Sequence, residues 1–167
     1  MAGGANVYGF AGGDPVNSAD PFGLCKDEKG KERDCLVTWV RKGQSEPDSA
    51  TMATARELAK RADVDLGLYS GRRKAGTNCA ESRHNCGKAF DVATVNGLVV
   101  RGGDDASAEV AELVVRVQSA ARGMSQVREN FGPAYLGWQG TGFEGTGPGL
   151  LKLWAGHQNH IHISIHD

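Results

Sequence analysis

The stretch that decides the fold closes the chain: His157-Gln-Asn-His160-Ile-His162-Ile-Ser-Ile-His166. Side chains alternate between the two faces of a β-strand. We therefore expect a strand over 159–166 whose isoleucines, at the odd positions, anchor it in the core. The even positions carry three imidazoles and Ser164 on the opposite face. A surface strand that contains histidine by chance is the plain alternative, but three alternating histidines favour a functional site.

A second stretch carries the same kind of chemistry: Ser82-Arg-His84-Asn-Cys-Gly87-Lys-Ala89-Phe-Asp91. Imidazole and carboxylate are both zinc ligands, and a catalytic zinc typically has three protein ligands with water in the fourth place. We expect His84 on a turn and Asp91 within a strand. Gly87 would let the backbone fold between them, because glycine tolerates conformations that other residues avoid.

These two stretches resemble a known family. Ser82, His84, Gly87, Ala89 and Asp91 reproduce the zinc motif of the LAS metallopeptidases, which include D-Ala-D-Ala carboxypeptidases, murein endopeptidases and the hedgehog signalling domain. Upstream, Ser70-Gly71-Arg72-Arg73 is similar to the Ser-Gly-Tyr-Arg of that family, with arginine in place of tyrosine. The ending from His157 to His162 is similar to the family's His-x-Asp-His-x-His. The resemblance spans 70–162, with the three motifs in the family's order.

The resemblance implies a role for each matching residue. His84, Asp91 and His162 match the zinc ligands, His160 matches a second-shell or catalytic histidine, and His157 matches a residue that stabilises the tetrahedral intermediate.

Substrate binding is expected from four further residues. Arg73 corresponds to an arginine that binds substrate or polarises the attacked carbonyl, and Ser82 belongs to the same zinc motif. Trp138 and Trp154 flank the glycine-rich segment 137–149, which reads as a loop. Either tryptophan would line a substrate groove or pack within the core or loop.

One position departs from the family pattern. The family has an acidic residue three positions before the last zinc histidine, as general base, and this chain has Asn159 there. An amide cannot accept the proton. Three explanations stay open: His160 or His157 is the base, the domain binds without cleaving, or Asn159 is an introduced inactivating change.

The beginning of the chain resembles a different family. Asp20-Pro21-Phe22-Gly23-Leu24 is similar to the motif that ends the Rhs/YD-repeat core and marks the boundary with a variable C-terminal toxin. The resemblance implies two units, residues 1–24 as the end of the core and residues 25–167 as the toxin domain, with cleavage after Leu24.

The remaining pattern predicts an α+β domain. We expect strands at 36–40, 65–70, 87–95 and 98–100, the last two joined by an Asn96-Gly97 turn. Apolar residues at spacings of three and four predict helices over 49–62 and 106–122. These elements favour a small antiparallel sheet with two helices packed behind it, as in the LAS and hedgehog fold.

Four cysteines form two local pairs, Cys25 with Cys35 and Cys79 with Cys86. Neither pair has the C-x-x-C spacing of zinc ribbons or redox motifs. Two short disulfide-closed loops are favoured over free thiols, in keeping with a target outside the cytoplasm.

Charge and hydropathy exclude some classes of partner. The formal net charge is −1, so bulk electrostatics predict neither nucleic acid nor an anionic membrane as a partner. No apolar run approaches the roughly 20 residues of a transmembrane helix, and no signal peptide is recognisable.

With the resemblances, this pattern leads us to expect a zinc-dependent peptidoglycan peptidase, an Rhs effector toxin secreted into the periplasm of target bacteria. Its expected partners are peptidoglycan stem peptides, a cognate immunity protein, and the Rhs core with its secretion apparatus. A zinc-containing cell-wall or peptide binding module without turnover is the main alternative. A metal-dependent nuclease is a third, although the lack of a basic patch disfavours it.

Overall fold

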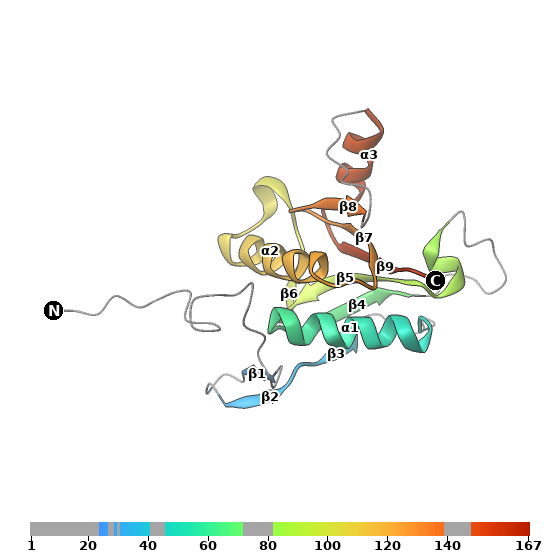
Figure 1. The fold of residues 1–167 in the computed structure, drawn as a ribbon. Helices are drawn as coiled ribbons and strands as arrows, with labels where there is room; N and C mark the ends of the chain where they lie inside the picture. Colours follow the sequence, from blue (N-terminus) through green and yellow to red (C-terminus); the bar gives the residue numbers. More distant parts are fainter. Residues whose placement is uncertain (1–23, 27–28, 30, 41–45, 72–81, 139–147) are drawn as a thin grey trace.

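The computed structural model describes residues 24–26, 29, 31–40, 46–71, 82–138 and 148–167 (Figure 1). The strands in this part of the chain are β1 (Leu24–Lys26), β2 (Glu32–Asp34), β3 (Val37–Trp39), β4 (Leu66–Ser70), β5 (Ala89–Val95), β6 (Leu98–Val99), β7 (Val127–Phe131), β8 (Leu136–Trp138) and β9 (Ile161–Ile165). The helices are α1 (Ser49–Ala62), α2 (Ala108–Arg122) and α3 (Pro148–Gly156), with short 3-10 turns η2 (Arg83–Cys86) and η3 (Gly103–Asp105).

The main sheet has the strand order β3-β4-β5-β9-β7-β8, and β6 pairs with the end of β5. The α+β class is therefore confirmed. The expectation of an antiparallel sheet is wrong at one place, because β3 and β4 run parallel. The physical reason is α1, which connects these two strands and returns the chain to the same end of the sheet, as a parallel pair requires.

Helices α1 and α2 cover one face of the sheet and form the core with it. Residues at helical spacing on α1, such as Ala55, Leu58 and Ala62, are fully buried together with Ile161 and Ile163 of β9. The isoleucine row predicted for the last strand is thus confirmed. None of the helices in the described residues is long and apolar enough to cross a membrane.

Helix α1 has the predicted bounds. Asp48 is its N-cap and accepts a hydrogen bond from the backbone N–H of Thr51 at 2.8 Å, which satisfies one of the helix's otherwise unpaired donors. The predicted turn between β5 and β6 is also present, since Asn96 and Gly97 have φ angles of 50° and 79°. Positive φ at both central residues is typical of the tight hairpin turn.

The region after α2 differs from the expectation. Strands β7 and β8 were not predicted, and the segment expected to be a loop over 137–149 contributes Gly137 and Trp138 to β8 and Pro148 and Gly149 to α3. Proline at the first helical position is favourable because it lacks an N–H that would be unpaired there in any case. Figure 1 shows α3 beyond β7 and β8, apart from α1 and α2. Residues 139–147 lie outside the described part.

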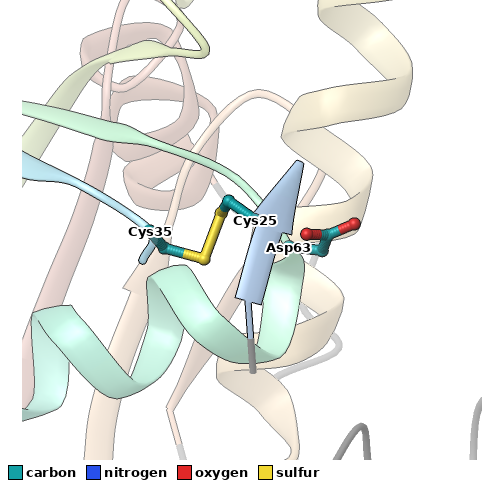
Figure 2. A group of neighbouring side chains, drawn as sticks. All are labelled: Cys25, Cys35 and Asp63. Atoms are coloured by element: carbon teal, nitrogen blue, oxygen red, sulfur yellow. A yellow bond between two sulfur atoms is a disulfide. The ribbon is translucent and has the colours of Figure 1, made fainter. Parts of the chain in front are cut away.

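The first described segment is a hairpin fastened by a disulfide. Strands β1 and β2 pair antiparallel, with Leu24 opposite Asp34, and the predicted bond between Cys25 and Cys35 is confirmed (Figure 2). Donor atoms of these cysteines and of Asp63 lie within 4.8 Å of one another. Because the two sulfurs are bonded to each other, the group is a structural link and not a metal site. Cys86 is disulfide-bonded, while Cys79, its predicted partner, lies outside the described residues.

Candidate metal centre

The three predicted ligands come together on the face of the sheet opposite the helices. Asp91 of β5 and His162 of β9 are directly opposite each other in the register of these neighbouring strands. His84 reaches them from η2, which is followed by Gly87 with a φ of 77°. A left-handed residue at this point lets the chain turn from η2 into β5, as the sequence predicted.

The donor atoms of this group are spaced as a metal requires. His84 Nε2 lies 3.1 Å from His162 Nδ1 and 3.2 Å from Asp91 Oδ1, and His162 Nδ1 lies 2.9 Å from Asp91 Oδ1. For tetrahedral zinc with bonds near 2.0–2.1 Å, adjacent ligand atoms are about 3.3 Å apart. The three atoms are therefore spaced as one triangular face of such a coordination shell would be, and the group could hold a metal ion.

The ring nitrogens that point away from this centre also have partners. His84 Nδ1 lies 2.7 Å from the carbonyl oxygen of Gly71, so this nitrogen carries the proton and Nε2 presents its lone pair. His162 Nε2 lies 3.5 Å from a carboxylate oxygen of Glu129. The His162 ring stacks on Phe131 with an interplanar angle of 17°. Outer contacts of this kind orient the imidazoles of metal sites.

The electrostatics of the group favour a positive charge at its centre. Burial alone would raise the pKa of Asp91, but His162 and His84 hold it well below its usual range. Burial would likewise lower the pKa of His162, yet Asp91 and Glu129 raise it to about 9. Without a metal, a proton on His162 thus supplies the charge that the carboxylates require.

Two more histidines lie beside the ligand group. His160 Nδ1 lies 2.8 Å from Asn159 Oδ1, where its proton is donated to the amide oxygen, and its Nε2 lies 3.9 Å from Asp91 Oδ1. Burial lowers the pKa of His160 to about 4. His157 donates from Nδ1 to the carbonyl oxygen of Leu153 at 2.7 Å, and its ring lies 4.8 Å from that of His160. The end of α3 therefore places His157 in the cluster.

The structure describes the other predicted site residues to different extents. Arg73 lies outside the described residues, and for Trp138 only the backbone, at the end of β8, is described. Ser82 precedes η2, where its carbonyl accepts a hydrogen bond from Asn85. Trp154 is 42% exposed on α3 and donates to the carbonyl of Pro133.

His166 does not belong with the other histidines. It follows the end of β9 and is exposed, and its backbone N–H donates to the carbonyl of Gln126. Ring contacts in the described part of the chain join His84, His157, His160 and His162. His166 was expected on the same face as these histidines; it is exposed just past the end of β9, and no ring contact in the described residues joins it to them.

Sequence reasoning missed several residues that surround the group. Glu129, Phe131 and Tyr69 contact the histidines. Glu129 and Phe131 lie on β7, a strand that the pattern did not reveal. Gly71 belongs to a predicted motif, but it acts through its backbone oxygen. No spacing rule marks such residues, since their proximity to the site depends on strand pairing.

Comparisons with known proteins find no matching family model, no similar curated protein and no similar solved structure. The function of the chain is therefore inferred from its site and its sequence motifs.

Proposed function

We propose that the chain is a zinc-dependent peptidase that cuts the peptide stems or cross-links of peptidoglycan. The observation that carries the proposal is the triangle of donor atoms from His84, Asp91 and His162, with sides of 2.9–3.2 Å. Two imidazoles and one carboxylate are a ligand set of catalytic zinc sites, which keep a fourth position for water or substrate. The chemistry that a zinc ion supplies there is a water of lowered pKa and a polarised carbonyl oxygen.

The neighbouring histidines have the geometry for proton handling. His160 donates its Nδ1 proton to Asn159, so its Nε2 is the atom that can accept a proton on the side of the ligand group. His157, held at Nδ1 by the carbonyl of Leu153, would stabilise negative charge that develops on the substrate. In this scheme Asn159 orients the base and does not replace it.

The wider context is part of the same proposal. The motif ending at Leu24 and the LAS-like motifs support an Rhs effector toxin that is delivered into the periplasm of rival bacteria. The disulfide between Cys25 and Cys35 suits an oxidising compartment. A producing cell would then need an immunity protein, and occlusion of the metal centre is the simplest way for it to act.

One observation favours a second candidate, a zinc-containing binding module without turnover. Asn159 cannot take a proton, and the pKa of about 4 makes His160 a weak base at neutral pH. General bases work best when their pKa lies near the operating pH. On this view the site binds zinc and a peptide but releases no product.

The test is to incubate purified bacterial sacculi with the zinc-loaded chain, with its Asn159→Asp variant and with His84→Ala as the metal-site control. Released muropeptides are identified by mass spectrometry. If the chain and Asn159→Asp both cut, a histidine is the base. If only Asn159→Asp cuts, the given chain is a disabled peptidase.

Two results would count against the peptidase. Equal release by His84→Ala would mean that the metal centre is not responsible. If no form cuts but the chain binds zinc and sacculi, the binding module is the better description. A plasmid-degradation assay with the same preparations tests the nuclease alternative.

A further inference from the structure

We propose that Glu129 is a positioning residue that orients His162 and holds its Nδ1 toward His84 and Asp91. The proposal rests on the metal centre of the proposed function, but it concerns how that centre is built. Glu129 Oε2 accepts a hydrogen bond from the hydroxyl of Ser164 and lies 3.5 Å from His162 Nε2. The Glu129 side chain is 15% exposed, so solvent competes weakly for its carboxylate.

The ring of His162 is held at each of its polar atoms and on one face. Nδ1 lies 2.9 Å from Asp91 Oδ1, Nε2 faces Glu129, and the ring plane stacks on Phe131 at a centroid distance of 5.6 Å. A rotation of the ring by half a turn would point a carbon where Nδ1 now lies. The carboxylate at Nε2 opposes that rotation, as carboxylates behind metal-bound histidines do.

A β-bulge explains why Glu129 faces the site. Val127 is opposite Ile165, whereas Glu129 is opposite Ser164, so β7 has one more residue than β9 between these pairs. Val127 and Ile165 are buried on the core face. In a regular ladder the residue at 129 would share that face. The extra residue, Arg128, moves Glu129 to the side of Ser164 and His162, which is the effect that bulges have beside functional sites.

The other face of β7 secures this register. Asn130 and Gln118 are both buried, and their side chains are joined through Gln118 Nε2 to Asn130 Oδ1 at 2.9 Å. Asn130 Nδ2 also donates to the backbone carbonyl of Gln118 at 2.7 Å. A slip of one residue would bury Glu129 against α2 and break these bonds, because register shifts exchange the two faces.

The first test measures zinc affinity by competition with a chromophoric chelator. We expect Glu129→Ala to bind zinc about 10- to 100-fold more weakly than the unchanged chain. Glu129→Gln keeps an acceptor oxygen beside His162 and should recover a large part of the loss. Glu112→Ala is the matched control, since Glu112 is an exposed glutamate of α2 that pairs with Arg116 one helical turn away. Equal affinity in all four proteins would overturn the proposal.

A second measurement keeps the proposal independent of catalysis. Nuclear magnetic resonance of ¹⁵N-labelled protein follows the Nε2 proton of His162, with and without zinc. Its exchange with water should be slower in the unchanged chain than in Glu129→Ala, and circular dichroism checks that both are folded. Equal exchange rates would refute the role of Glu129. If the chain binds no zinc, the proposed function fails, while the exchange rates in the metal-free protein still test the orientation of His162.

Discussion

At the scale of the residue, His84 shows how a backbone contact prepares a ligand. The bond from Nδ1 to the Gly71 carbonyl leaves Nε2 as the nitrogen that faces Asp91 and His162. The side chain is 2% exposed, so the ring does not exchange this bond for water. Orientation before binding lowers the entropy that is lost when a metal is taken up.

We therefore predict that His84→Ala weakens zinc binding by more than about 100-fold, since it removes a ligand and not only a supporting contact. Isothermal titration with zinc measures the effect. His166→Ala is the control, because His166 is exposed and follows β9 without joining the ligand group. A comparable loss in both variants would argue against the assigned ligand set.

At the scale of the element, the hairpin β1–β2 is closed by a disulfide and contacts the domain through Arg33. Its disulfide closes a loop with a sequence separation of 10. Arg33 of β2 forms an ion pair with Asp65, which also accepts a hydrogen bond from the backbone N–H of Leu36 at 2.8 Å. These contacts hold the hairpin against the start of β3 and β4.

The double variant Cys25→Ser, Cys35→Ser should lower the free energy of unfolding by about 2–3 kcal/mol, the value expected when a loop of this length is no longer closed in the unfolded chain. Urea unfolding under oxidising conditions, followed by tryptophan fluorescence, measures the difference. If the midpoint and slope of the unfolding curve are unchanged, the disulfide does not stabilise the fold by restricting the conformations of the unfolded chain.

Acid should weaken the contact between Arg33 and Asp65. The hydrogen bond from Arg33 is the main reason that the pKa of Asp65 lies below its ordinary value of 3.8. A lowered pKa in the folded state stabilises the fold above the unfolded value, and this contribution is lost as the pH falls below about 3.8 through the folded pKa.

The difference in unfolding free energy between the unchanged chain and Asp65→Asn should therefore be larger at pH 7 than at pH 2.5. Urea unfolding at the two pH values measures it. A difference that is independent of pH would mean that the charge of Asp65 is not what stabilises this contact.

At the scale of the whole molecule, the two faces of the sheet have different roles. One face packs on α1 and α2 and forms the core, while the other brings together residues from η2, β5, β7 and β9 around the metal centre. The ligands come from distant parts of the chain, so they meet only when the sheet is complete. Binding of a metal ion by this group would consequently be coupled to folding.

Zinc at about 100 times its dissociation constant should stabilise the folded chain by about 2.7 kcal/mol. For a domain of this size that corresponds to a rise in Tm of roughly 5–10 °C. Differential scanning fluorimetry with zinc, and again after a chelator is added, measures the shift and its reversal. His84→Ala should show little shift. A Tm that does not change when zinc is added would contradict the proposed metal centre.

Several elements of the fold and the candidate ligands could be predicted from the sequence. Periodicity located α1 and α2 because their apolar residues recur every three or four positions, and alternation located β9 because its isoleucines must be buried. The three candidate ligands were implied by the resemblance of the motifs around 82–91 and 157–162 to those of the LAS metallopeptidases. Strands β7 and β8 were missed because neither Val127–Phe131 nor Leu136–Trp138 alternates clearly between apolar and polar residues. Helix α3 was missed because glycines surround its start.

The sequence by itself therefore determined the α+β class and the buried face of the last strand, since these depend on local pattern. Its resemblance to the LAS motifs pointed to the three residues that the structure brings together. Only the tertiary structure decided that β3 and β4 are parallel, that His166 is exposed past the end of β9, and that Glu129 lies beside Nε2 of His162. The physical reason is that these relations depend on strand order, register and a single bulge. They arise from packing between segments distant in the chain, and no local pattern encodes them.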